Sequence, residues 1–112
     1  MLKSEILNSI QNVAKDRKIN PKENSYTNYL FEKGIDKILK KVGEEATETI
    51  IASKSGNKQE TIYETADLIY HLTVMLTDME IEWNEVFDEL EAREIKSGNL
   101  KQKNHPEEIT EY

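Results

Sequence analysis

Hydrophobic positions along this 112-residue chain repeat with the spacing of α-helices rather than of β-strands. Apolar residues recur every three or four positions, which keeps them on one face of a helix. No apolar–polar alternation of period two is long enough to indicate a strand. The pattern therefore predicts helices over about residues 3–18, 25–31, 35–53, 59–79 and 83–96.

Local signals mark where these helices begin and end. Asn20-Pro21 ends the first, because the residue before a proline is disfavoured in a helix. Ser25 is suited to N-cap the short second helix, and Asn57 to N-cap the fourth, where it resembles the start of a capping box. The connection between the two long helices is only a few residues around Gly56, so these helices are expected to lie antiparallel.

The two long helices differ in how their apolar residues are distributed. The helix over 59–79 is apolar around much of its circumference, which is typical of a central helix. The helix over 35–53 carries a single apolar stripe beside a charged arc. The stripe consists of Ile35, Leu39, Val42, Ala46, Ile50 and Ser53.

Size and composition indicate one domain with a modest core of its own. A chain of 13.0 kDa buries only about two-thirds of its unfolded surface. Its hydrophobic fraction of 37% is low for a monomer, and its charged fraction is 33%. We expect an all-α antiparallel bundle of four to five helices whose core is completed by dimerisation, with residues 1–98 as the domain and 99–112 as a polar C-terminal tail.

Charge and cysteine content exclude several classes of function. The net charge of -7 argues against nucleic acid and anionic membranes as general partners. The absence of cysteine excludes disulfides, zinc–thiolate sites and thiol chemistry. No apolar run approaches a membrane span and the N-terminus lacks a signal-peptide core, so a cytoplasmic location is expected.

Two groups of acidic residues lie on the two long helices. Glu44, Glu45 and Glu48 form the first group, and Glu64 with Asp67 the second. Like charges three or four residues apart share a helix face and destabilise it by roughly 0.2–0.5 kcal/mol per pair. Antiparallel pairing would bring the two groups together, and an all-oxygen cluster suits Mg²⁺, or Mn²⁺ in its place. The opposing interpretation is that each acid is a solvated surface residue.

Three other polar residues lie close to the acids. Lys41 is one turn before Glu45, and Lys37 is near it, so both are candidates to contact phosphate. A solvated surface lysine is an equally good interpretation of Lys41. His71 lies one turn after Asp67, where it would bond a ligand carboxylate or a phosphate, or instead be a buried core histidine.

These motifs resemble a known superfamily. Glu44-Glu45-x-x-Glu48 followed by Glu64-x-x-Asp67 is similar to the metal signature of the all-α nucleoside-triphosphate pyrophosphohydrolases, the MazG-like superfamily. Three further strings resemble the phosphoribosyl-ATP pyrophosphohydrolases of histidine biosynthesis. They are Ser25-Tyr26-Thr27, Lys40-Lys41-Val42-Gly43-Glu44-Glu45 and Ala66-Asp67-Leu68-Ile69-Tyr70-His71-Leu72.

The resemblance implies Mg²⁺-dependent hydrolysis of the α–β phosphoanhydride of phosphoribosyl-ATP by a homodimer or larger homo-oligomer. It also implies roles for particular residues. The implied metal ligands are Glu45, Glu48, Glu64 and Asp67, and the implied catalytic carboxylates are Glu44 and Glu45. Glu44 would be either a further ligand or the group that orients water. The implied substrate contacts are Ser25, Tyr26, Thr27, Lys37, Lys41 and His71.

Two other functions fit parts of the same pattern. The acidic groups suit a housecleaning pyrophosphohydrolase of non-standard nucleoside triphosphates equally well, and only the Ser-Tyr-Thr and Tyr-His strings favour phosphoribosyl-ATP. A non-enzymatic helical assembly module would leave the acids solvated. No partner cyclohydrolase domain is expected, although about twenty polar residues follow Arg93, where the family usually ends.

Overall fold

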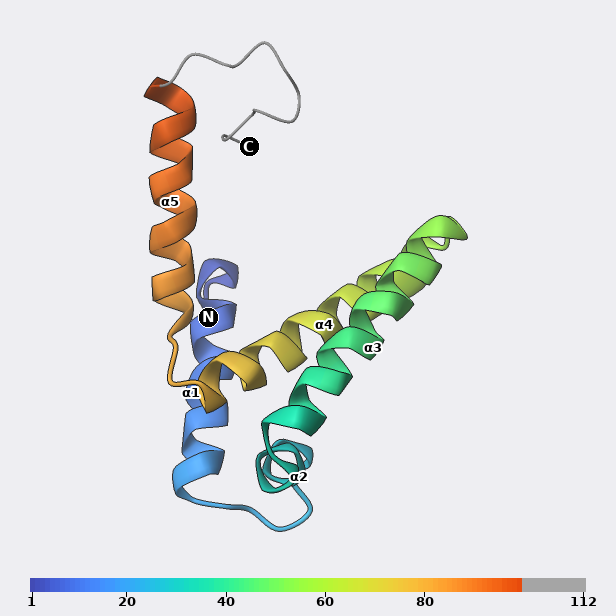
Figure 1. Cartoon of the computed structure of the whole chain (residues 1–112), viewed down its shortest axis with the longest axis vertical. Helices are drawn as coiled ribbons and strands as arrows, with labels where there is room; N and C mark the ends of the chain where they lie inside the picture. The colour runs from blue at the N-terminus through green and yellow to red at the C-terminus, as the bar shows by residue number, and fades with distance from the viewer. Residues whose placement is uncertain (100–112) are drawn as a thin grey trace. The chain divides into compact units, whose positions relative to one another are not determined.

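A computed structural model describes residues 1–99 of the chain, and all of the predicted helices are present in it (Figure 1). They are α1 (Ile6–Ile19), α2 (Tyr26–Lys33), α3 (Ile35–Lys54), α4 (Lys58–Asp78) and α5 (Trp83–Asn99), preceded by a short 3-10 turn, η1 (Lys3–Glu5). No strand occurs among residues 1–99, which confirms the all-α class. Apart from Asn99, the predicted tail over 99–112 lies outside the described residues.

The two side-chain caps predicted from the sequence, and one further glycine, set helix boundaries in the structure. The Ser25 hydroxyl accepts a hydrogen bond from the Asn28 N–H (3.2 Å) and begins α2. The side-chain oxygen Oδ1 of Asn57 accepts a hydrogen bond from the Glu60 N–H (3.0 Å) and begins α4. Gly34 joins α2 directly to α3 with φ of 91°, a conformation that favours glycine.

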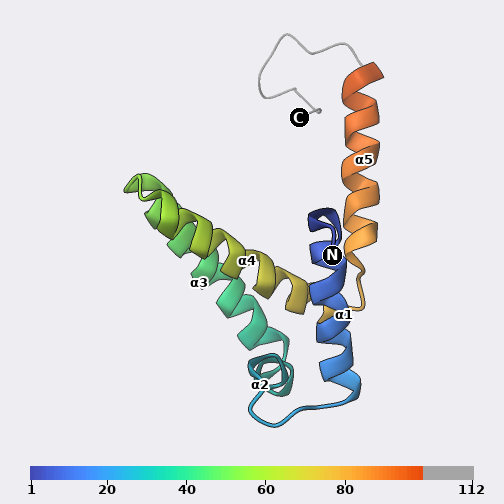
Figure 2. The same cartoon turned by 180° about the vertical axis from the view of Figure 1, so that it is seen from behind.

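The described chain falls into two compact units. The first runs from Met1 to Ile81 and contains η1 and α1 to α4, and the second begins at Glu82 and contains α5. Within the first unit, α3 and α4 lie side by side and antiparallel, as both views show (Figures 1 and 2). The short α2 contacts α3 and α4, and α1 contacts α4 and α2.

The apolar core of this unit lies where α2, α3 and α4 meet. Leu30, Ile38 and Val74 are fully buried there, one from each helix. Partly buried apolar residues surround them. These are Phe31, Tyr70 and Met75. The core therefore fixes one end of the α3–α4 pair, and the turn at Gly56 closes the other.

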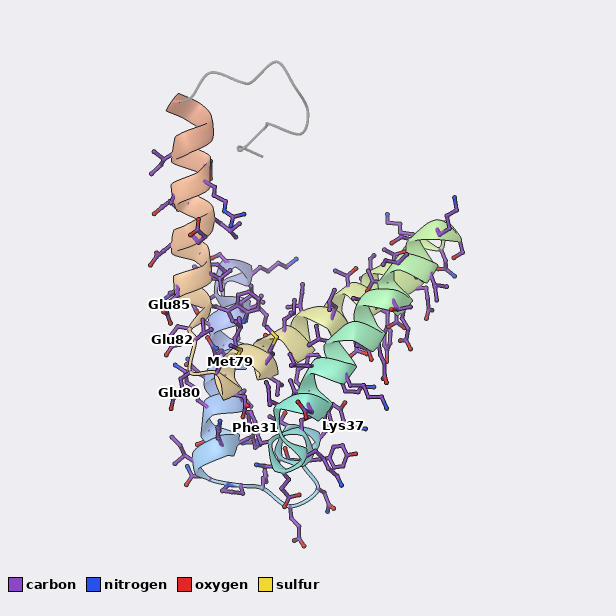
Figure 3. The ribbon with its side chains drawn as sticks, viewed as in Figure 1. Phe31, Lys37, Met79, Glu80, Glu82 and Glu85 are labelled. Carbon is purple, nitrogen blue, oxygen red and sulfur yellow. The ribbon has the colours of Figure 1, made fainter. Side chains whose placement is uncertain are left out.

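Polar contacts made by two residues of α1, Lys18 and Gln11, hold this helix against the core. Phe31, labelled on α2 in Figure 3, lies under the Lys18 ammonium at 5.1 Å, and Lys18 also pairs with Asp78 at 3.0 Å. The buried Gln11 amide donates to the Thr77 hydroxyl (3.2 Å) and to the Ile81 carbonyl (2.9 Å). A buried amide needs such partners, because leaving it unsatisfied costs about 1–3 kcal/mol.

The face of α3 that is buried differs from its apolar stripe. The buried residues are Ile38, Glu45 and Ala52, spaced seven apart. Ile50 of the stripe is instead 68% exposed, and Ile62 on α4 is 54% exposed. A carboxylate thus occupies the middle of the seam between α3 and α4, with the apolar stripe beside it. The most buried stretch of α4, in contrast, is His71 to Thr77 near the core.

None of the helices described here has the length and apolarity required to cross a membrane.

Replacing Leu30 with alanine tests the position of the core. Because Leu30 is fully buried at the junction of three helices, Leu30→Ala should lower the free energy of unfolding by about 2–5 kcal/mol. Urea denaturation at one fixed protein concentration measures it. The control is Ile19→Ala at the exposed end of α1, expected to change stability by less than about 0.5 kcal/mol. Equal losses in the two variants would mean that the core lies elsewhere.

Candidate functional site

The acidic groups of α3 and α4 converge at the seam between the two helices. Glu45, Glu48 and Glu64 each offer one carboxylate oxygen, and these oxygens lie within 4.8 Å of one another. Glu45 is 4% exposed and Glu64 is 8% exposed, whereas Glu48 is open to solvent. The predicted meeting of the two groups is therefore confirmed, and we call these three residues the acidic centre.

A second set of groups adjoins the acidic centre on the side of the core. Glu45, Asp67 and His71 bring one atom each within the same 4.8 Å limit. Glu45 belongs to both sets, so it is the residue around which the site is arranged. Asp67 and His71 lie one turn apart on α4, as their spacing predicts.

Burial makes the acidic centre electrostatically unfavourable by itself. Burial raises the pKa of Glu64 to about 7, and the nearby Glu48 and Glu45 carboxylates add to this shift. The pKa of Glu45 is also raised, first by burial and then by Asp67. Two buried oxygens, Oε2 of Glu45 and Oε2 of Glu64, have no hydrogen-bond partner among residues 1–99. Buried carboxylates without partners are costly, and their oxygens are the donors that Mg²⁺ prefers, so these residues fit a hard divalent cation.

Lys41 lies at the edge of the acidic centre. Its ammonium donates to Oε2 of Glu44 (3.2 Å) and lies 3.6 Å from Oε1 of Glu45. This hydrogen bond lowers the pKa of Glu44 and raises that of Lys41. Glu44 is itself exposed and contributes no atom to either converging set among the described residues. Lys37, labelled in Figure 3 on the first turn of α3, also lowers the pKa of Glu44.

His71 is buried and both of its ring nitrogens have partners. Nδ1 lies 2.8 Å from the backbone carbonyl oxygen of Asp67, and Nε2 lies 2.9 Å from the Tyr26 hydroxyl. Oδ1 of Asp67 is farther from Nδ1, at 3.6 Å. With 2% exposure, His71 has the surroundings of a core histidine, although it lies beside the acids.

The Ser-Tyr-Thr string is placed at the start of α2, and its three members have different surroundings. Ser25 uses its hydroxyl to cap the helix. Thr27 shares a short hydrogen bond with the Tyr70 hydroxyl. The Tyr26 ring stacks on Tyr29 and Tyr70 and meets the edge of His71, at centroid distances of 6.0, 6.2 and 5.7 Å. The string therefore joins α2 to α4 next to the acidic centre.

Two hollows beside the acids are lined by predicted metal ligands together with residues to which sequence reasoning assigned no site role, such as Tyr63, Tyr70 and Glu60. One hollow of about 240 Å³ is lined by Tyr63, Ala66, Asp67 and Tyr70. Another of about 350 Å³ is lined by Glu48, Ile51, Ala52, Ser55, Glu60 and Glu64. The heptad spacing of Tyr63 and Tyr70 was the available signal for the first hollow, but the same spacing is typical of ordinary packing.

Comparison with known proteins identifies the family to which the chain is similar. Residues 7–94 match the family described as Phosphoribosyl-ATP pyrophosphohydrolase. The chain is 57% identical over 106 residues to a Phosphoribosyl-ATP pyrophosphatase of Clostridium acetobutylicum, covering 95% of this chain and 96% of that one. It is 50% identical over 107 residues to the enzyme of the same name from Streptococcus thermophilus, covering 96% and 100%.

A longer relative matches over part of its length. The Histidine biosynthesis bifunctional protein HisIE of Caldanaerobacter subterraneus subsp. tengcongensis is 64% identical over 89 residues, which are 80% of this chain and 43% of that protein. The chain thus spans less than half of this bifunctional relative and nearly the whole of the relatives with a single named activity. By its match over most of its length, the chain belongs to the phosphoribosyl-ATP pyrophosphohydrolase family.

Proposed function

We propose that this chain hydrolyses phosphoribosyl-ATP to phosphoribosyl-AMP and pyrophosphate, the second step of histidine biosynthesis, and that it requires Mg²⁺. Family membership supports the reaction and its substrate. The observation that carries the metal requirement is the pair of buried carboxylate oxygens, on Glu45 and Glu64, that have no hydrogen-bond partner in the described part of the chain. Such a pair is expected in a site built for a cation and not in a solvated helix face.

The ligands would come from both long helices. Glu45, Glu48 and Glu64 would hold the ion, with Asp67 beside them; Mn²⁺ has the same preference for oxygen donors. When bound, the ion neutralises charge on the phosphate oxygens and positions a water molecule. In the reaction, water adds across the α–β phosphoanhydride, one P–O bond breaks, and pyrophosphate leaves.

The other charged residues have roles at the edge of this centre. Of the two carboxylates expected to be catalytic, Glu45 belongs to both converging sets, whereas Glu44 bonds Lys41. Lys41 is the cation nearest to the acids and would contact a phosphate group of the substrate. Lys37, one turn earlier on α3, would add positive potential at the same end.

We also propose that the chain functions as a homodimer. Large apolar side chains are exposed on the two helices near the Gly56 turn. They are Ile50, Ile51, Ile62 and Tyr63. A second copy that covered this surface would complete the modest core of a small chain.

Hydrolysis should depend on Mg²⁺ and on Glu48. The wild-type chain should release pyrophosphate from phosphoribosyl-ATP with Mg²⁺ and release none with a chelator present. Glu48→Gln removes a ligand oxygen at constant volume, so the rate should fall by roughly two orders of magnitude or more while the circular dichroism spectrum is unchanged.

The matched control is Glu60→Gln. Glu60 is an exposed glutamate that lines the same hollow as Glu48 but belongs to neither converging set. It should keep near-normal activity. Faster hydrolysis of a free nucleoside triphosphate than of phosphoribosyl-ATP would reassign the substrate, and full activity of Glu48→Gln would reject the acidic centre as the metal site.

Metal-free protein should lose stability as the pH rises through the range in which Glu64 titrates. Its pKa is raised from 4.5 to about 7, so between these values the unfolded chain ionises Glu64 while the folded chain keeps it protonated. The contribution of Glu64 therefore falls from about pH 4.5 to pH 7. Without metal, wild type should become less stable relative to Glu64→Gln over this range. Thermal unfolding with a chelator measures the difference, and parallel pH profiles of the two proteins would contradict it.

Light scattering tests the dimer. Wild type should have twice the chain mass of 13.0 kDa, and Ile50→Lys should shift the population to the single-chain mass by placing a charge on the exposed apolar surface. Lys54→Glu, a charge change at the end of the same helix, serves as a control and should keep the larger mass. A wild-type protein of single-chain mass would refute the dimer.

A further inference from the structure

The hollow of about 240 Å³ beside the acids has two aromatic walls and a small floor. Tyr63 and Tyr70 lie seven residues apart on α4, which is about 10.5 Å along the helix axis. Ala66 and Asp67 lie between them on the same side of the helix. The side chain of Ala66 is too small to fill the space between the two rings. The hollow is therefore open to a flat ligand that enters between the tyrosines.

The two aromatic walls differ in how firmly they are held. Tyr70 is partly buried, and its hydroxyl shares a hydrogen bond with Thr27. Its ring stacks on Tyr26 at 6.2 Å and meets the edge of the His71 ring at 5.1 Å, so its orientation is restricted. The Tyr63 side chain, in contrast, is 66% exposed. A flat ring bound in the hollow would cover part of this exposed surface, which apolar burial favours.

Both hollows adjoin the acids, but they offer different chemistry. Asp67 lines the aromatic hollow and also has an oxygen within 4.8 Å of a Glu45 oxygen, so a molecule bound there lies next to the proposed ion. The hollow of about 350 Å³ adjoins the acidic centre through Glu48 and Glu64, and Glu60 is a third glutamate in its lining. None of the described residues that line this second hollow is aromatic.

The substrate of the proposed function has two parts that need different surroundings. Phosphoribosyl-ATP carries a polyphosphate and a flat purine ring, and a single ribose separates them. With the polyphosphate at the acidic centre, the purine must lie about one sugar away from it. A purine gains stability by stacking on aromatic side chains, and every base has a face that can stack. Of the two hollows beside the acids, the one between the tyrosines provides such surfaces.

We propose that the hollow between Tyr63 and Tyr70 binds the purine ring of phosphoribosyl-ATP, with Tyr70 as the fixed wall and Tyr63 as the wall that stacks on the ring when substrate is bound. This assignment rests on the proposed function. Tyr63 supplies aromatic surface and Ala66 leaves the space for the ring. Neither residue acts on the phosphoanhydride, so changes at both positions should affect KM rather than kcat.

Removing the exposed aromatic ring tests the stacking. Tyr63→Leu keeps an apolar side chain, and the KM for phosphoribosyl-ATP should rise about five- to hundredfold while kcat changes less than about twofold. Tyr63→Phe keeps the ring and should retain the wild-type KM. Because Tyr63 also belongs to the apolar surface of the proposed dimer, the control is Ile62→Ala. Ile62 is exposed on the same surface but does not line the hollow, so its KM should be unchanged.

Filling the hollow tests the space. Ala66 is exposed and leucine is a good helix former, so Ala66→Leu should fold normally and occupy the place of the purine. Its KM should rise at least about tenfold, whereas Ala66→Ser, which stays small, should keep the wild-type KM. Calorimetric titration with the product phosphoribosyl-AMP, which has the same purine, should show a similar loss of affinity in Ala66→Leu without any turnover. Thermal unfolding and light scattering of each variant check its fold and its mass.

Three results would overturn the purine assignment: an unchanged KM in either Tyr63→Leu or Ala66→Leu, a fall in kcat at constant KM, or an equal rise of KM in Ile62→Ala and Tyr63→Leu. The last result would mean that the change acts through association of two chains. Absence of phosphoribosyl-ATP hydrolysis by wild type would instead reject the proposed function. The titration with phosphoribosyl-AMP then decides the matter, because no binding by wild type, or equal binding by wild type and Ala66→Leu, overturns the assignment.

Discussion

The main constraint on this structure is that two carboxylates, Glu45 and Glu64, are held together inside the seam between two helices. Most seams of this kind are filled by aliphatic side chains, which gain free energy from burial without requiring partners. Here the middle of the seam instead holds acids with buried oxygens that have no hydrogen-bond partner among the residues that the structure describes. The surrounding structure must oppose their repulsion, and the raised pKa of each group measures how unfavourable its ionised form is there.

The two ends of the α3–α4 pair oppose the repulsion between these carboxylates. At one end, Leu30, Ile38 and Val74 form a fully buried apolar core, and at the other the turn at Gly56 links the helices covalently. The acids lie between these two fixed points, where the helices cannot separate to relieve the repulsion. A site that is destabilising by itself is thus maintained by a fold whose stability comes from elsewhere, as is common for functional sites.

Much of this arrangement follows from local sequence signals, and the rest depends on long-range packing. Helix spacing, the caps at Ser25 and Asn57 and the short turn predict the five helices, the antiparallel pairing and the meeting of the acids. The buried face of α3 was not predictable in the same way, because its apolar stripe lies beside the seam rather than in it. The bond between Tyr26 and His71 joins residues 45 apart in the sequence, so no local pattern could indicate it.

The polar seam and the exposed apolar stripe have one physical origin. Ile50 lies five residues after Glu45 on α3, and five residues correspond to about 500° of rotation, which is about 140° more than one full turn. When Glu45 points toward α4, Ile50 must therefore lie on another side of the helix, where it is exposed. An acid in the seam therefore displaces apolar surface to the outside of the same helix. That surface has no partner among the described residues of the single chain, and hydrophobic burial would favour covering it. The buried acidic centre and the exposed apolar surface on which the proposed homodimer rests are then two consequences of the same orientation of α3.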